Sequence, residues 1–257
     1  MSPKNKRSPL KEKPLRYPGE YLDEQILDLR DKTFPYIAYC GVMIFFIGDQ
    51  WFRWIRKIPP SNPLPATILL VFVLIFCIFK IRKFYLEIVQ LRMARDGEMI
   101  VGQSLEELRT LGAVVFHDVP GEKFNVDHLV VATQGIYAVE TKTISKPLKG
   151  DARVKLDGKR LLINGREMDR NPLEQAKALA RWVSELLAKS TGKRFSVKPV
   201  VLFPGWYVEP IKGEEEVWVL NHKALAAFIK NEKQKISDED LHLAAFHLTR
   251  YIQAKRG

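Results

Sequence analysis

The first third of the chain contains two apolar runs, Phe34 to Gly48 and Leu64 to Phe79. Counted with their flanks, they extend over residues 34–52 and 63–81, close to the length of about 20 residues with which a helix crosses a bilayer. Aromatic residues lie at the ends of the runs, and the second run lacks the polar face that a helix in a soluble core keeps. The pattern predicts a transmembrane helical hairpin, with a buried or re-entrant pair of helices as the alternative.

The basic residues around these runs predict an orientation. Lys and Arg precede the first run and follow the second, whereas the connecting loop holds only Arg53, Arg56 and Lys57. Because basic residues collect on the cytoplasmic side, both termini are expected there, at the inner or plasma membrane of the cell. Residues 1–32 are polar, basic and interrupted by prolines, which predicts a flexible cytoplasmic arm with a short amphipathic helix over residues 21–30. The predicted domains are therefore residues 1–32, 33–83 and 84–257.

Beyond residue 83, amphipathic segments alternate with short β-branched segments. Glu98 falls on the same helical face as Val101, Leu105 and Leu108, and Asn171-Pro172 is a typical helix start. The predicted elements are a helix running on from the second apolar run, a strand over 113–119, hairpins over 126–142 and 153–163, a helix from 171, strands over 197–203 and 217–220, and helices over 222–231 and 238–254. In the helix from 171, Gln175, Leu179, Trp182 and Leu186 are expected to share one inward stripe.

The hairpin over residues 126–142 carries the candidate chemistry. A turn at Thr133-Gln134-Gly135 sets Val131 opposite Ile136, and the same register sets Asp127 opposite Glu140. Directly opposed residues have Cβ atoms about 4.5–5.5 Å apart, so two carboxylates there repel unless a cation lies between them. A divalent metal would serve, with Lys142 on the same face as Glu140. A strand whose charged end is simply solvated is the alternative, and His128 is expected on the opposite face.

The net charge of +11 does not by itself indicate nucleic acid. Residues 1–83 hold 14 Lys and Arg against seven Asp and Glu, which leaves a net charge of only +4 for residues 84–257. Within that part, the second predicted hairpin region is basic, and it is interpreted either as a phosphate-contacting surface or as a solvated face. Its basic residues are Lys149, Arg153, Lys155, Lys159, Arg160 and Arg166.

A wider set of motifs resembles the nuclease-related domain (NERD) family over about residues 94–205. The motifs are Gly97-Glu98 with Val101, Leu105 and Leu108, then Gly112 to Val119, Asn125 to Val131, Gly135 to Lys142, and Asn171-Pro172 with Gln175. The resemblance implies an α/β fold with a restriction-endonuclease-like mixed sheet flanked by helices, and a nuclease dependent on Mg²⁺ or Mn²⁺. The pattern of Asp127 followed by Glu140-Thr141-Lys142 resembles a PD-(D/E)xK active site. By this resemblance, Asp127 and Glu140 would bind the metal and Lys142 would position the attacking water. Glu98, otherwise explained by the helix dipole, would support the metal, and Gln175 would orient the site.

These observations predict a membrane-anchored nuclease that hydrolyses phosphodiester bonds of DNA or RNA on the cytoplasmic side. The first alternative is a non-catalytic, membrane-tethered module that binds nucleic acid or another partner through a nuclease-like fold. The second is a membrane scaffold in which the Glu-x-Lys sequence is incidental. The sequence leaves the choice between DNA and RNA open.

Overall fold

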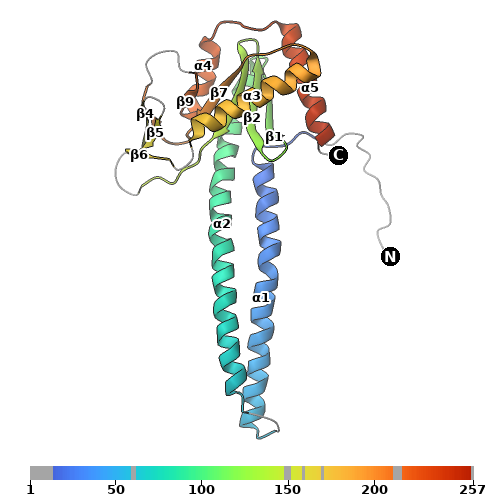
Figure 1. Ribbon diagram of the computed structural model, residues 1–257, viewed down its shortest axis with the longest axis vertical. Coiled ribbons are helices and arrows are strands. Elements are labelled where there is room, and N and C mark those ends of the chain that lie inside the picture. The colour runs from blue at the N-terminus through green and yellow to red at the C-terminus, as the bar shows by residue number, and fades with distance from the viewer. Residues whose placement is uncertain are drawn as a thin grey trace, which may run out of the picture. The chain divides into compact units, whose positions relative to one another are not determined.

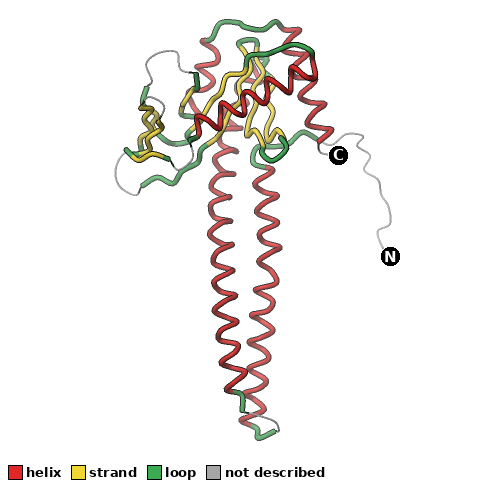
Figure 2. The backbone as a smooth tube through the Cα atoms, viewed as in Figure 1, coloured by secondary structure: helices red, strands yellow, loops and turns green. Residues whose placement is uncertain are grey.

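The computed structural model describes residues 14–58, 62–147, 152–157, 160–168, 171–210 and 216–255. It divides into two compact units, one formed by residues 21–93 and the other by residues 94–257 together with residues 1–20. In their described parts, the first unit is helical and the second contains all the strands (Figures 1 and 2). The predicted domain limits stay predictions; residues 20–32, assigned above to an arm, form the first turns of a long helix.

The helical unit is built from α1, Glu20–Ile55, and from α2, Leu64–Thr110, whose residues up to 93 belong to this unit. Each predicted apolar run lies inside one of these helices. The helices run antiparallel, since Trp51 Nε1 donates to Thr67 Oγ1 at 3.0 Å, while Ile26 packs in one cluster with Ile88. The two runs therefore form a pair of adjacent helices.

The apolar surface of α2 bears on the membrane prediction. Among the helices in the described ranges, α2 alone is long and apolar enough to cross a membrane, by length and composition only. Only 11% of its most apolar window is buried, whereas the core helix of a soluble protein would be mostly buried. A crossing by both α1 and α2 stays a prediction.

The main sheet of the second unit has the strand order β1-β2-β3-β7-β9. The β1–β2 and β2–β3 pairs are antiparallel, and the β3–β7 and β7–β9 pairs are parallel, so the sheet is mixed as predicted. The strands are β1 Val114–Pro120, β2 Asn125–Ala132, β3 Gly135–Thr141, β7 Val197–Leu202 and β9 Trp218–Leu220.

Helices cover both faces of this sheet, because its central strands are apolar on both sides. On one face, α3 (Pro172–Thr191) and α5 (Asp238–Lys255) pack against Leu129 and Ala138. On the other, the last turns of α2 and the helix α4 (Leu225–Asn231), which follows the 3₁₀ turn η1 (His222–Ala224), pack against Val130 and Val139. The predicted α/β class with a helix-flanked mixed sheet is confirmed.

A second sheet is inserted between β3 and β9 and has the order β6-β5-β4-β8. It contains the second predicted hairpin, whose register sets Leu156 opposite Leu161, while residues 158–159 lie outside the described residues. The strands are β4 Arg153–Asp157, β5 Arg160–Ile163, β6 Arg166–Glu167 and β8 Tyr207–Val208, of which β6 and β8 were not predicted.

Candidate functional site

The hairpin formed by β2 and β3 has the predicted register. Val131 lies opposite Ile136, Leu129 lies opposite Ala138, and the paired region ends with His128 opposite Val139. One residue further, Asp127 reaches the end of β3, where its Oδ2 accepts a hydrogen bond from the Thr141 backbone N–H at 2.7 Å. The turn chemistry read from the sequence therefore carries Asp127 to the strand end that bears Glu140.

Glu140 is the centre of a three-residue contact. Its Oε1 accepts a hydrogen bond from Lys142 Nζ at 2.6 Å and another from Gln175 Nε2 at 2.7 Å. Lys142 Nζ also donates to Gln175 Oε1 at 2.9 Å. Each side chain of this triangle thus contacts the other two, and Lys142 is held in one position by two acceptors.

The start of α3 positions Gln175. Asn171 is the N-cap, its Oδ1 accepting from Leu173 N at 3.0 Å, and Pro172 takes the first helical position as the sequence predicted. Gln175 follows in the first turn, where its amide reaches Glu140. The predicted inward stripe is offset, because the buried face of α3 runs through Ala176, Leu179, Val183 and Leu187, and Gln175 is exposed at its border.

Glu98 approaches the same strand end from α2, and Gly97 permits the approach. A Cβ atom on Gly97 would lie 1.7 Å from Thr143 Oγ1, so only glycine allows the chain after Lys142 to pack this closely against α2. Glu98 itself is 7% exposed. The Gly97-Glu98 pair therefore places a carboxylate beside the end of β3.

Two carboxylate oxygens at this place have no hydrogen-bond partner among the described residues. They are Glu98 Oε2 and Glu140 Oε2, and both are buried. Buried polar atoms without a partner are rare and costly, and they often mark a functional position.

The negative charges of the carboxylates raise one another's pKa values. Burial, together with the charges of Asp118 and Glu140, raises the pKa of Glu98 to about 8, while a Gly19 backbone hydrogen bond and Lys142 act in the opposite direction. Burial and then the charges of Glu140 and Glu98 raise the pKa of Asp127 well above its usual range. The pKa of Glu140 is also raised by burial, against the effects of Lys142 and Gln175. Mutual repulsion of this kind is what a bound cation would relieve.

Asp118 is a member of this group that the sequence analysis missed. It is 2% exposed and has a left-handed backbone with a φ of 48°. Its neighbours in β1 pair as His117 with His128 and Val119 with Val126, which places Asp118 across from Asp127. A carboxylate inside a strand whose other residues, apart from His117, are apolar was the available signal. Asp118 joins Glu98, Asp127, Glu140, Lys142 and Gln175 in what is called the carboxylate site below.

The histidines lie apart from this arrangement, as expected for His128. Its Nδ1 lies 2.8 Å from His117 Nδ1, and both rings are buried. Burial lowers the pKa of His117 to about 4 and that of His128 well below its usual value, so both are neutral at physiological pH. We assign neither ring to the carboxylate site.

The donor set can be compared with what a divalent cation needs. In the described ranges, no three His, Cys, Asp or Glu side chains converge closely enough to hold a metal ion by themselves. Mg²⁺ is typically bound through one or two carboxylates and keeps several waters or substrate oxygens. The unpartnered oxygens of Glu98 and Glu140 and the raised pKa values fit a hydrated cation of this kind.

Comparison with known proteins gives one finding. The family model described as nuclease-related domain (NERD) matches residues 94–204. Neither the curated proteins nor the solved structures returned a significant match. The matched segment includes all six residues of the carboxylate site, so this site lies in the part of the chain that is similar to nuclease-related domains.

Proposed function

We propose that the chain is a membrane-anchored nuclease that hydrolyses phosphodiester bonds of DNA or RNA on the cytoplasmic side and depends on Mg²⁺ or Mn²⁺. The observation that carries the proposal is the pairing of Glu140 Oε1 with Lys142 and Gln175, next to a Glu140 Oε2 that has no partner in the described structure. The match of residues 94–204 to the nuclease-related domain supports a nuclease-related function.

Asp127 and Glu140 would hold the cation, with Glu98 beside them. When bound, such a cation supplies Lewis acidity and lowers the pKa of a water molecule. The carboxylates fit this role because they share one strand end and raise one another's pKa values. Asp118, through its charge on Glu98, adds to the negative potential there.

Hydrolysis adds water across a P–O bond, so the attacking water loses a proton and the leaving oxygen gains one. Lys142 Nζ, fixed by Glu140 and Gln175, is placed to orient the water or to offset charge on the phosphate. Glu98, a buried carboxyl group at the same strand end, is placed to exchange a proton with the water. Gln175 keeps the lysine in place.

The anchor would be the helical pair that contains residues 34–52 and 63–81. Its support is the exposed apolar surface of α2 and the excess of basic residues on the terminal sides of the two runs. Tethering in this way would confine the nuclease to substrates that reach the membrane surface.

The alternative of a non-catalytic, membrane-tethered binding module has one observation in its favour. No three ligands among the described residues are already gathered around one point, so the fold could be kept without turnover. The two functions differ at Lys142. In a nuclease, Lys142→Met should lower turnover at least 100-fold while nucleic-acid affinity falls less than threefold; in a binding module there is no turnover to lose.

The deciding experiment is a cleavage assay on the full-length chain purified in detergent. Single-stranded and double-stranded DNA and RNA would be incubated with Mg²⁺, Mn²⁺ or EDTA. The matched control is the double variant Asp127→Asn, Glu140→Gln from the same purification, which excludes a contaminating nuclease. Cleavage that needs the metal and disappears in the double variant supports the proposal; absence of cleavage on every substrate with either metal overturns it.

A further inference from the structure

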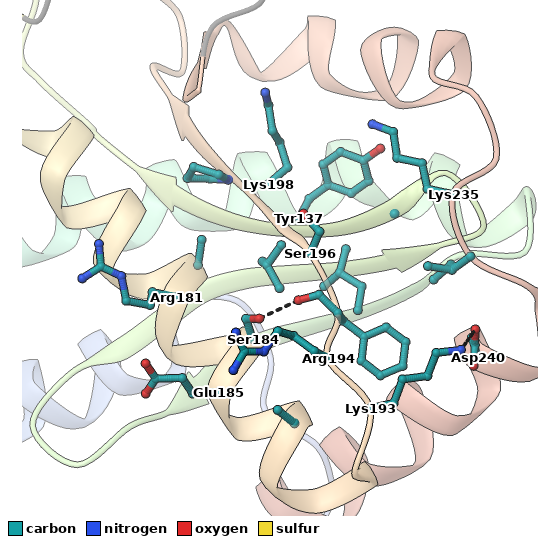
Figure 3. Close-up of a pocket in the computed structure, with 18 of the residues that line it drawn as sticks. Tyr137, Arg181, Ser184, Glu185, Lys193, Arg194, Ser196, Lys198, Lys235 and Asp240 are labelled. Atoms are coloured by element: carbon teal, nitrogen blue, oxygen red, sulfur yellow. Dashed lines mark hydrogen bonds and ion pairs between the residues drawn. The ribbon is translucent and has the colours of Figure 1, made fainter.

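A groove with a volume of about 1020 Å³ runs beside α3 (Figure 3). Its walls are one side of α3, the first residues of β3 and β7, the segment 193–196 and the start of α5. At its middle, Ser184 Oγ donates to the Phe195 carbonyl oxygen at 2.5 Å, which ties α3 to the segment before β7. It is called the α3 groove below.

The α3 groove is positively charged. Its described lining contains seven Lys or Arg side chains and three Asp or Glu side chains. Two of these acids are already engaged, Asp240 with Lys193 and Glu216 with Lys177. The seven basic residues are Lys177, Arg181, Lys189, Lys193, Arg194, Lys198 and Lys235.

Three of these cations are available for a ligand. Arg181, Lys189 and Arg194 are exposed and form no ion pair with any described residue. Figure 3 shows Arg181 and Arg194 on the side of the groove occupied by α3 and the segment that follows it. Unpaired cations that converge on one groove favour an anionic ligand.

The cations form a row and not a point cluster. Lys177, Arg181 and Lys189 lie on one side of α3 over about 18 Å at 1.5 Å per residue, with Glu185 midway between the last two. Arg194, in the segment between α3 and β7, lines the same groove, whereas Lys198 Nζ lies over the Trp218 ring, 5.3 Å from its centroid. A single phosphate group would need one or two of these charges, whereas a row of this length matches successive phosphates of a nucleic-acid backbone.

The lining also indicates which part of a nucleic acid is contacted. Its aromatic side chains among the described residues, Tyr137 and Phe195, are 1% and 3% exposed. Single-stranded binding sites stack bases on exposed aromatic rings, and this groove offers none in its described lining. Contact through phosphates alone is typical of sequence-independent binding to a duplex.

The α3 groove begins close to the carboxylate site at the start of α3, where Lys177 follows Gln175 by two residues, and extends to the opposite end of β3. The groove contains Gly135 to Tyr137 at the start of β3, and the carboxylate site contains Glu140 at its end and Lys142 beyond. Seven residues of extended chain, from Gly135 to Lys142, span about 23 Å. We propose that the α3 groove is a second nucleic-acid binding site, which holds the sugar-phosphate backbone of a duplex independently of its sequence. That the carboxylate site cuts the same duplex rests on the proposed function; binding in the groove does not.

The test compares two triple variants of the full-length chain in detergent. The groove variant carries Arg181→Gln, Lys189→Gln and Arg194→Gln, and the control carries Lys123→Gln, Lys223→Gln and Lys233→Gln, which are exposed, lie outside the groove and remove the same charge. Fluorescence anisotropy with a labelled 30-base-pair duplex would be recorded from 50 to 200 mM salt. The groove variant should bind at least tenfold more weakly, and its log–log salt slope should fall by about 2 to 3. The control should stay within twofold of the wild type.

Equal affinities for the two triple variants would overturn the proposal. So would displacement of the duplex by inorganic tripolyphosphate at an equal phosphate concentration, because the ligand would then be a small anion. Groove-dependent binding of a single strand that is tighter than that of the duplex would also contradict it. If the wild type binds through the groove and never cuts, the proposed function fails and the groove stands; if it cuts and the groove variant binds normally, the reverse holds.

Discussion

Glu140 uses one carboxylate oxygen for Lys142 and Gln175 and leaves the other without a partner in the described structure. The two contacts fix the orientation of the carboxylate, because both donors approach the same oxygen. A buried acceptor in a fixed orientation is already arranged for a cation and need not reorganise when one binds. The same geometry makes Asp127 and Glu140 unequal, since of the two only Glu140 accepts a hydrogen bond from Lys142 in the described structure.

That inequality gives the first prediction, on Asp127→Asn. The variant should lose metal-dependent cleavage at least 100-fold, because a neutral amide is a weaker ligand. The metal-free protein should be more stable by about 0.2–1 kcal/mol, because a like-charge contact disappears while the amide oxygen can still accept from Thr141 N. Thermal denaturation in EDTA measures the second effect.

The control for that prediction is Glu140→Gln, which should also lose cleavage. It should gain no stability, because it weakens the contacts of Lys142 and Gln175 with a charged partner. Cleavage by both variants at near wild-type rates would show that these residues are not the site.

Glu98 gives a prediction about pH. Its folded pKa of about 8 exceeds its ordinary value of 4.5, because burial and the charges of Asp118 and Glu140 outweigh Lys142 and the Gly19 backbone. The folded protein therefore binds a proton that the unfolded chain releases. The stability from this group is fully present below about pH 4.5 and is lost as the pH rises through about 8.

In EDTA, the contribution of Glu98 should thus lower the melting temperature as the pH rises from 5 to 8. Asp127 and Glu140 contribute with the same sign, since their pKa values are raised as well. Glu98→Gln should make the fall less steep than in the wild type. Identical slopes for Glu98→Gln and the wild type would contradict the assignment.

At the scale of elements, the β2–β3 hairpin could be predicted because its register depends on a short turn and on local alternation. The sequence also allowed the positions of three site residues to be predicted. Glu140 and Lys142 share a strand face, and Gln175 follows a clear helix N-cap. The position of Asp118 could not be predicted from the sequence, because it depends on a left-handed backbone inside β1 and on the pairing of β1 with β2. The sequence did not predict the α3 groove. Its charged residues come from α3, β7 and the region before α5, and a periodic pattern describes only one element at a time.

The N-cap of α3 can be tested as the device that positions Gln175. Asn171→Ala removes the acceptor for Leu173 N and should lower stability by about 1 kcal/mol. It should also reduce turnover, because the first helical turn carries Gln175 and through it Lys142. Asn171→Ser keeps a capping oxygen and should restore both properties. Turnover at the wild-type level in a destabilised Asn171→Ala protein would show that the cap serves only the fold.

At the scale of the whole molecule, the two compact units have different surfaces. Residues 21–93 expose large apolar side chains along both helices, whereas the second unit buries an apolar core on each face of its sheet. Exposed apolar surface on this scale is unusual for a soluble monomer and is expected to meet lipid or a partner. The helical unit therefore suits an apolar environment, whereas the carboxylate site suits an aqueous one that contains phosphate and a cation.

The last prediction concerns how the chain crosses the membrane. Basic residues before the first run and after the second exceed the three in the loop, so the loop should be translocated and both ends retained. A reporter fused after residue 57 should be active only outside the cytoplasm, and one fused after residue 90 only inside. Recovery of the full chain in the soluble fraction without detergent would rule out the anchor. If a reporter after residue 57 is active inside the cytoplasm, either α2 alone crosses the membrane or neither helix does. If α2 alone crosses, the carboxylate site lies outside the cytoplasm, away from cytoplasmic nucleic acid. The topology experiment therefore also tests whether the proposed substrate can reach the site.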